Sequence, residues 1–149
     1  MKILLIEDET LATDKLERMI ERYDESHEIV DKLRSVEAAT TWFEAHEAPD
    51  LLFLDIHLLD GTCFDILQAI DIPCPVIFTT AYDEYALEAF QLNSVDYLLK
   101  PISYARLEQA FQKLETMQQS FQQQQQAQQL DSVLHALQNQ QQSYKTRFL

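Results

Sequence analysis

Five short apolar runs, separated by polar and turn-forming stretches, organise the first hundred residues of the chain. They lie at Lys2–Ile6, His27–Leu33, Leu51–Leu54, Val76–Thr79 and Val95–Leu99. Runs of this length that are bounded by turn-forming residues predict β-strands. All except His27–Leu33 are nearly continuous in apolar residues, which is typical of strands buried on both faces of a parallel sheet.

Helical periodicity fills the stretches between these runs, because apolar residues recur there every three or four positions. The first predicted helix begins at Glu9 or Thr10 and has the apolar residues Leu16, Met19, Ile20 and Tyr23; the second follows the N-cap Ser35 and has Val36, Ala39, Trp42 and Phe43. The third and fourth helices are predicted at Phe64–Ile70 and Asp83–Leu92. The last follows a cap at Ser103 and has Leu107, Phe111 and Leu114. Strands that alternate with helices in this way predict an α/β fold. We expect a five-stranded parallel sheet of flavodoxin-like order 2-1-3-4-5, with helices on both faces.

Polar side chains follow four of the predicted strands at the point where each strand ends. Glu7 and Asp8 follow the first strand, Asp55 the third, Thr80 the fourth and Lys100 the fifth. The carboxyl ends of parallel strands form the edge where ligands bind in such sheets. The three acids make an oxygen-rich site suited to Mg²⁺. A carboxylate with a lysine and a hydroxyl nearby suits phosphoryl transfer, so we expect Asp55 to be a phosphate-accepting aspartate beside a metal site.

Each of these residues has a plainer explanation when it is taken alone. An acid pair after a strand often complements a helix N-terminus. Asp55 could cap a loop, and Thr80 is a β-branched residue of the kind that strands favour. The combination of these residues, in this order and at strand ends, favours the functional interpretation.

The composition narrows the range of partners and compartments. The net charge of -14, from 25 acidic residues against 11 lysines and arginines, argues against nucleic-acid binding by this chain itself. Cys63 and Cys74 form no CxxC pair, so we expect a reducing cytoplasm rather than a disulfide framework or a zinc site. No apolar stretch reaches about 18 residues, and Lys2–Ile6 leaves no room for a signal peptide. Gly61, the sole glycine, excludes a dinucleotide-binding turn and a P-loop.

The composition changes sharply after Met117. Residues 118–142 contain 13 glutamines and one charged residue, Asp131, which is typical of a low-complexity linker. Glutamine forms helices adequately, so two alternatives stay open for the linker: an ordered helix that pairs in a dimer, or a flexible tether. The final stretch, Tyr144–Leu149, is basic and apolar, and it predicts the first strand of a further domain that is missing.

Four motifs at the strand ends resemble the receiver domain of two-component response regulators. They are Leu5-Ile6-Glu7-Asp8-Glu9, Phe53-Leu54-Asp55-Ile56, Phe78-Thr79-Thr80-Ala81 and Asp96-Tyr97-Leu98-Leu99-Lys100-Pro101. Val76–Pro101 resembles the LytTR subclass, and Tyr144–Leu149 is similar to the opening of a LytTR DNA-binding domain. The resemblance implies a CheY-like, non-enzymatic receiver domain at 1–117, a linker at 118–142 and the start of a truncated LytTR-type DNA-binding domain at 143–149.

The resemblance also implies a role for each acid of the site. Asp55 would accept a phosphoryl group from the phosphohistidine of a sensor histidine kinase. Asp8, Asp55 and the backbone carbonyl of His57 would bind Mg²⁺ directly. Glu7 would act on the metal through a water molecule.

The remaining residues of the motifs would sense the phosphoryl group. Lys100, placed by a cis peptide bond before Pro101, would contact it, and Thr80 would move toward it. Tyr97 would swing inward as Thr80 moves, although it could also be a plain buried strand aromatic. The face that changes would carry the aromatic side chains Tyr82, Tyr85, Phe90, Tyr97 and Tyr104. We expect phosphorylation to favour a homodimer through this face, which would bring two DNA-binding domains onto DNA half-sites.

Several positions depart from the family pattern. Leu59 and Cys63 stand where the family usually has a proline and a glycine, so the conformation of this loop stays open, and Gly61 could relocate its turn. Glu7 replaces the commoner aspartate. Three other functions stay open: a phosphohydrolase, which would usually have an acid in place of His57; a stand-alone receiver that acts through protein–protein contacts; and a receiver that no longer takes phosphate.

Overall fold

The computed structural model describes residues 1–82 and 94–147, and the side chains among them up to residue 138. The strands are β1 (Lys2–Ile6), β2 (Glu28–Leu33), β3 (Leu51–Asp55), β4 (His57–Leu58), β5 (Gly61–Thr62), β6 (Val76–Thr80) and β7 (Asp96–Leu99). The helices are α1 (Thr10–Tyr23), α2 (Val36–Ala45), α3 (Cys63–Ala69) and α5 (Tyr104–Arg147). The helix that the sequence predicts at Asp83–Leu92 lies outside the described residues. Within them, no helix is both long and apolar enough to cross a membrane.

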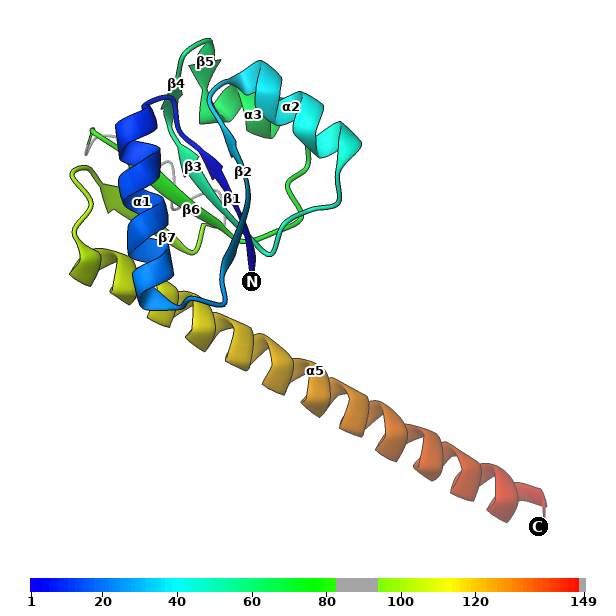
Figure 1. Ribbon diagram of the computed structural model, residues 1–149. Helices are drawn as coiled ribbons and strands as arrows, with labels where there is room; N and C mark the ends of the chain where they lie inside the picture. The colour runs from blue at the N-terminus through cyan, green and yellow to red at the C-terminus, as the bar shows by residue number, and fades with distance from the viewer. Residues whose placement is uncertain (83–93, 148–149) are drawn as a thin grey trace. The chain divides into compact units, whose positions relative to one another are not determined.

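The main sheet has five parallel strands in the order β2-β1-β3-β6-β7 (Figure 1). This order confirms the predicted flavodoxin-like topology, since β6 and β7 are the fourth and fifth strands of the sheet in sequence. The register aligns the strand ends: Ile6 pairs with Leu54, Asp55 with Thr79 and Thr80 with Leu99. The residues that follow β1, β3, β6 and β7 are therefore brought to one edge.

Strands β1, β3, β6 and β7 are largely buried on both faces, as their continuous apolar runs predicted, whereas β2 at the sheet edge is partly exposed. Alternate residues of a strand point to opposite faces, so each face of the sheet carries its own part of the core. One face packs against α2 and α3 through Leu4, Ile6, Ala39, Trp42, Leu52, Leu54, Cys63, Ile66 and Phe78. On the other face, Phe53 of β3 meets Phe111 of α5 at 5.9 Å between ring centroids. Phe111 in turn stacks on Tyr23 of α1 at 4.6 Å.

Helix starts follow the local sequence signals. The Ser35 hydroxyl oxygen accepts a hydrogen bond from the Ala38 N–H at 3.0 Å, which confirms it as the N-cap of α2. The Ser103 hydroxyl oxygen likewise accepts from the Arg106 N–H at 3.2 Å. Helix α1 begins at Thr10, with Glu9 in the cap position.

A short antiparallel hairpin follows the third strand, where the sequence left the loop conformation open. His57 pairs with Thr62 and Leu58 with Gly61, so Leu59 and Asp60 form the turn. Gly61 lies in a crowded position: a Cβ added there would clash with the Asp65 carboxylate and lie 3.2 Å from a methyl group of Val36, so these side chains would have to shift. The turn therefore lies one position before Gly61, and the hairpin packs closely on the start of α2.

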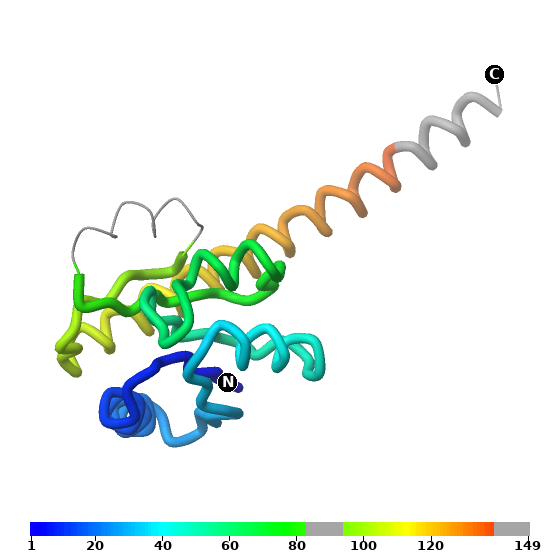
Figure 2. Tube along the Cα trace, turned by 90° about the horizontal axis from the view of Figure 1, so that it is seen from above, coloured from blue at the N-terminus to red at the C-terminus, as the bar shows by residue number. Residues whose placement is uncertain are grey.

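The chain divides into two compact units, Met1–Lys113 and Leu114–Leu149. Helix α5 (Tyr104–Arg147) includes the glutamine-rich segment, and Figure 2 shows the coloured part of this helix. Whether the segment pairs in a dimer stays a prediction. In the part of α5 from residue 117 to residue 138, the larger apolar side chains are exposed, with exposed fractions between 45% and 61%: Met117, Phe121, Leu130, Val133, Leu134 and Leu137.

The structure overturns one expectation at the end of this helix. Residues 144–147 are helical, where the sequence predicted the first strand of a further domain. Helix propagation adds one backbone hydrogen bond for each residue fixed, so a helix already formed through the glutamines extends into this stretch. The assignment of 143–149 to a DNA-binding domain stays a prediction.

An ion pair ties the last strand to the start of α5. The Arg106 guanidinium donates to both carboxylate oxygens of Asp96, at 2.8 and 2.7 Å, and to the Tyr97 carbonyl at 3.0 Å. Burial disfavours the charge of Asp96, but the hydrogen bonds from Arg106 and from the Tyr97 N–H outweigh it and lower the pKa of Asp96. This carboxylate is almost fully buried, whereas 39% of the Arg106 side chain is exposed.

We expect Arg106→Met to lower the free energy of unfolding at pH 7 by about 1–3 kcal/mol, since it leaves a buried carboxylate without its main partner. The loss should shrink as the pH falls through the lowered pKa of Asp96, because protonation removes the charge that Arg106 stabilises. Urea unfolding at pH 7 and at acidic pH measures both effects, with the exposed Arg18→Met as control. An equal loss at both values would contradict the ion-pair explanation.

Candidate acidic phosphoryl site

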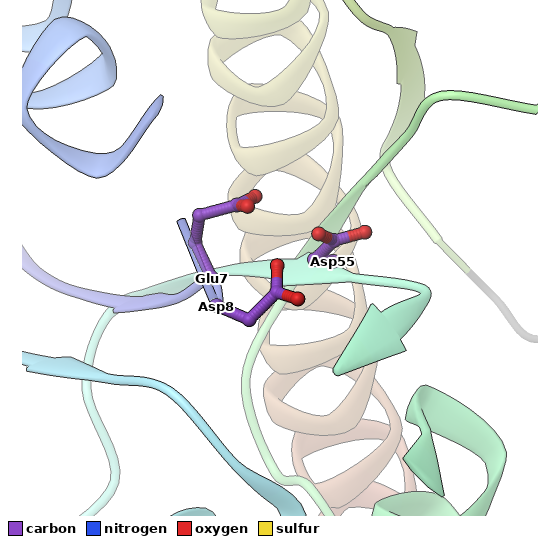
Figure 3. Close-up of side chains that lie close together, drawn as sticks. All are labelled: Glu7, Asp8 and Asp55. Carbon is purple, nitrogen blue, oxygen red and sulfur yellow. The ribbon is translucent and has the colours of Figure 1, made fainter. Parts of the chain in front are cut away.

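Three carboxylates gather at the edge where β1 and β3 end. Glu7 and Asp8 follow β1 directly, and Asp55 is the last residue of β3. One carboxylate oxygen from each lies within 4.8 Å of the others, and Figure 3 shows the three groups turned toward a common space. Glu7 and Asp55 are both only 4% exposed, whereas Asp8 is half-buried. The sequence predicted this grouping, and the parallel register produces it.

Lys100 brings a single ammonium group to two of these acids. Its Nζ lies 2.6 Å from Glu7 Oε2 and 2.8 Å from Asp55 Oδ2. Its backbone N–H donates to the Thr80 carbonyl at 2.7 Å, which fixes the residue beside the end of β6. The peptide bond between Lys100 and Pro101 is cis, as predicted. Burial disfavours the ammonium, but its bonds to Asp55 and Glu7 outweigh this and raise the pKa of Lys100.

Glu7 is the acid whose protonation is most affected by the site. Burial, opposed by the hydrogen bond from Lys100 and reinforced by the nearby charge of Asp55, raises the pKa of Glu7 to about 7. Without a metal, Glu7 therefore holds a proton over much of the pH range in which an ordinary glutamate is ionised. A divalent cation would favour the ionised form, because metal ligands bind as deprotonated groups.

Metal-free wild-type protein should lose stability as the pH rises from about 5 to about 8. The folded state keeps a proton on Glu7 that the unfolded chain releases, so unfolding becomes easier as the pH rises through this window. With a pKa of about 7 in place of 4.5, the loss is on the order of 2 kcal/mol.

Glu7→Gln should flatten this part of the stability curve, because a neutral side chain has no proton to release. Urea unfolding in the presence of a chelator, followed through the buried Trp42, measures the slope for both proteins. The exposed Glu47→Gln is the matched control and should keep the wild-type slope. Parallel curves for wild type and Glu7→Gln would contradict the assignment of the raised pKa.

The two predicted switch residues meet at the backbone of Tyr82. The Thr80 hydroxyl oxygen, fully buried, accepts from the Tyr82 N–H at 3.1 Å. The Tyr97 hydroxyl donates to the Tyr82 carbonyl, and its side chain is largely buried. From the sequence, Tyr82 was placed only among the aromatic residues of one face. Its hydrogen bonds to Thr80 and Tyr97 use backbone atoms, which every residue type has, so the sequence does not mark them.

His57 lies next to the predicted phosphoacceptor. Its backbone N–H donates to Asp55 Oδ1 at 3.2 Å. Its ring meets the Tyr82 ring edge-on, with centroids 5.1 Å apart. The hairpin pair with Thr62 fixes the main chain of His57, so the backbone beside the acidic group is well defined.

The donor set suits a hard divalent cation. Three carboxylates against one ammonium leave an excess of negative charge. Their oxygen atoms are the kind of ligand that Mg²⁺ prefers. Of the three acids, Glu7 lines a cavity of about 440 Å³, together with Lys100, side chains of α1 such as Lys15 and Leu16, and Pro101. The site therefore combines a candidate cation position with space for a second molecule.

Comparison with known proteins points to one family. The family model described as the response regulator receiver domain matches residues 3–112. Sensory transduction protein LytT of Bacillus anthracis is 39% identical over 123 residues, which are 80% of this chain and 49% of that protein. Transcriptional regulatory protein LytR of Staphylococcus aureus (strain N315) is 35% identical over 120 residues, or 76% of this chain and 47% of that protein. The chain thus spans about half the length of the curated relatives it matches.

Solved structures agree on the fold. The response regulatory domain of protein mrkE from Klebsiella pneumoniae superposes with a TM-score of 0.70 at 32% identity, covering 80% of this chain and 99% of that one. The response regulator TrrA from Thermotoga maritima, solved in complex with Mg(2+)-BeF, superposes with a TM-score of 0.64 at 24% identity, covering 76% and 97%. At that identity the second likeness concerns the fold alone.

Proposed function

Because the chain belongs to the response regulator receiver domain family, we propose that it accepts a phosphoryl group on Asp55 from the phosphohistidine of a sensor histidine kinase. The family is a signalling family without turnover of its own. The observation that carries the proposal is the contact of Lys100 with both Asp55 and Glu7, beside Asp8. This arrangement supplies a carboxylate nucleophile, a cation for the transferred oxygens and a site for a metal.

Mg²⁺ fits the acidic site and would be held by Asp8, Asp55 and the His57 carbonyl, with Glu7 acting through water. When bound, it would neutralise charge on the carboxylates and on the transferred phosphoryl oxygens. Glu7 would act in this role as the ionised form, which a bound cation favours; the pKa of about 7 applies to the metal-free protein.

In the transfer itself, a carboxylate oxygen of Asp55 forms a bond to phosphorus while the N–P bond of the phosphohistidine breaks. The imidazole leaves with the electron pair of that bond and takes a proton from solvent. In the unphosphorylated protein the Lys100 ammonium donates a hydrogen bond to Asp55 Oδ2 at 2.8 Å. After the transfer it would move to a phosphoryl oxygen and neutralise part of its charge.

Phosphorylation adds about -1.5 to -2 charge at the sheet edge. The Thr80 hydroxyl then turns away from the Tyr82 N–H and donates to a phosphoryl oxygen. The hydrogen bond that the Tyr97 hydroxyl donates to the Tyr82 carbonyl changes as a result. Both changes act on the chain just before residue 83. The arrangement favours one of two conformations of this region, which is how a local charge acts as a switch.

The switch would favour homodimerisation through the face that the sequence assigns to the fifth strand (β7), the last helix (α5) and the predicted helix at 83–92, which lies outside the described residues. Support comes from the exposed side chains of Tyr82 and Leu99, at 52% and 44%. Tyr85 and Phe90, which the sequence places on the same face, lie outside the described residues. Light scattering with and without a phosphoryl mimic tests this, and an unchanged mass would refute it.

Control of transcription would follow through a LytTR-type DNA-binding domain, as the name of the transcriptional regulator LytR suggests for that relative. DNA would bind through that domain rather than through residues 1–149, whose net charge is -14.

The direct test is phosphoryl uptake by the wild-type chain. Incubation with a small phosphodonor and Mg²⁺, followed by intact mass measurement, should show one added phosphoryl group, and a chelator should prevent it. A chain that stays unmodified under both conditions would refute the proposed function.

A further inference from the structure

The segment 34–37, which comprises the turn after β2 and the first two residues of α2, contacts both loops of the acidic site. It contributes none of the three clustered carboxylates. One contact reaches the loop after β1, which carries Asp8, and the other reaches the hairpin after β3. These contacts come from Arg34 and Asp60, neither of which has a role in the proposed phosphoryl transfer.

Arg34 holds the loop after β1. Its guanidinium donates through Nε and Nη2 to the Asp8 carbonyl oxygen, at 3.2 and 3.0 Å. Two donors from one rigid group converge on this single acceptor, so the position and tilt of the Asp8 peptide are defined. The Asp8 side chain extends from that backbone, which makes its placement depend on Arg34.

Asp60 holds the hairpin from the opposite side. Its Oδ1 accepts from the Val36 N–H at 2.7 Å and its Oδ2 from the Glu37 N–H at 3.1 Å. These two N–H groups open α2, where helix geometry leaves donors without intrahelical partners. The same two bonds lower the pKa of Asp60. Gly61 suits the contact, because a Cβ added there would lie 3.2 Å from a methyl group of Val36, which is tighter than most such contacts.

The hairpin carries this constraint back to the site. Asp60 lies in its turn, and His57 begins its first strand, paired with Thr62. The His57 N–H in turn donates to Asp55 Oδ1. A hairpin anchored at Asp60 therefore fixes the backbone next to Asp55, two residues from the phosphoacceptor itself.

We propose that Arg34 and Asp60 are positioning residues, which hold the two loops of the acidic site in register through the segment 34–37. Mg²⁺ demands near-octahedral geometry, so ligands from two separate loops bind it well only if those loops keep a fixed spacing. The inference rests on the proposed function in so far as the acidic site is the Mg²⁺ site.

Calorimetric titration of Mg²⁺ into the full chain tests the proposal without any phosphodonor. Arg34→Gln and Asp60→Ala should each weaken Mg²⁺ binding by about 3–10-fold, at or below the low end of the effect of residues that hold metal ligands directly. Arg34→Lys, which can still donate to the Asp8 carbonyl, should recover part of the affinity. Asp60→Asn, which keeps one acceptor oxygen, should fall between wild type and Asp60→Ala.

Two exposed residues serve as matched controls. Arg18, which donates to a carbonyl of its own helix, is changed to Gln, and Asp71, in the loop before β6, is changed to Ala. Both controls should bind Mg²⁺ within about twofold of wild type. Melting curves of all variants separate weakened binding from loss of fold, since the affinity is compared only between folded proteins.

The outcomes separate the inference from the proposed function. Unchanged Mg²⁺ affinity in folded Arg34→Gln and Asp60→Ala, or no recovery by Arg34→Lys and Asp60→Asn, would overturn the positioning roles even if wild type takes up phosphate. Wild-type protein that binds Mg²⁺ but takes up no phosphoryl group would refute the proposed function while the graded affinities still support the positioning roles. Wild-type protein that binds no Mg²⁺ would overturn the inference.

Discussion

Asp55→Asn should reduce phosphoryl uptake by at least about a thousandfold, since it replaces the nucleophile of the transfer. An amide oxygen has no full negative charge with which to attack phosphorus. Asparagine also has the size of aspartate, and its oxygen can still accept from Lys100. The variant should therefore fold like wild type while losing the reaction.

Intact mass after incubation with a small phosphodonor and Mg²⁺ measures the effect over a time course. Asp71→Asn, the same chemical change at an exposed site, should take up phosphate at the wild-type rate. Equal uptake by wild type and Asp55→Asn would sink the assignment of Asp55. If Asp55→Asn still took up phosphate and the double variant with Asp8→Asn did not, Asp8 would be the modified residue instead.

The strand ends were predictable because topology brings them together. Buried parallel strands have continuous apolar runs, and the polar residue after each run lies at the same edge whatever the details of packing. Glu7, Asp8, Asp55 and Lys100 are all placed by this rule alone. The cluster could thus be derived from the sequence before any distance was known.

The support around the cluster could not be derived in the same way. The two-residue strands of the hairpin are too short to leave a periodic signal, and their pairing depends on the tertiary contact of Asp60 with the start of α2. The contact of Arg34 with Asp8 joins residues 26 positions apart through a backbone carbonyl. Backbone acceptors are present at every residue, so the sequence does not mark which one is used.

The glutamine-rich segment shows a different limit. Its composition is compatible with a helix or a coil, and propensity differences among such residues are a few tenths of a kcal/mol each. The helix continues there because it is already formed at Tyr104, and propagation is easier than initiation. The same continuation explains why residues 144–147 are helical rather than a strand.

Lys100→Met should lower the free energy of unfolding of the metal-free protein by about 2–4 kcal/mol at pH 8. The change removes the ammonium that lies 2.6 Å from Glu7 and 2.8 Å from Asp55, and it leaves two buried carboxylates facing each other. Methionine keeps most of the volume of the lysine stem, so the loss reports on charge rather than on a cavity. Lys2→Met, at an exposed position, is the control.

Two further dependences distinguish this from a general packing defect. The loss should shrink toward pH 5, because Glu7, whose pKa is already raised to about 7 by burial, then takes up a proton and removes one of the two facing charges.

Added Mg²⁺ should stabilise Lys100→Met more than wild type, since the metal replaces the missing cation, whereas in wild type it competes with the ammonium for the same oxygens. Urea unfolding of wild type and Lys100→Met is measured at pH 5 and at pH 8, each with chelator and with Mg²⁺. The loss in free energy of unfolding is thus obtained under all four conditions. A loss that is equal at both pH values and unaffected by Mg²⁺ would show that Lys100 stabilises the fold through packing rather than through its charge.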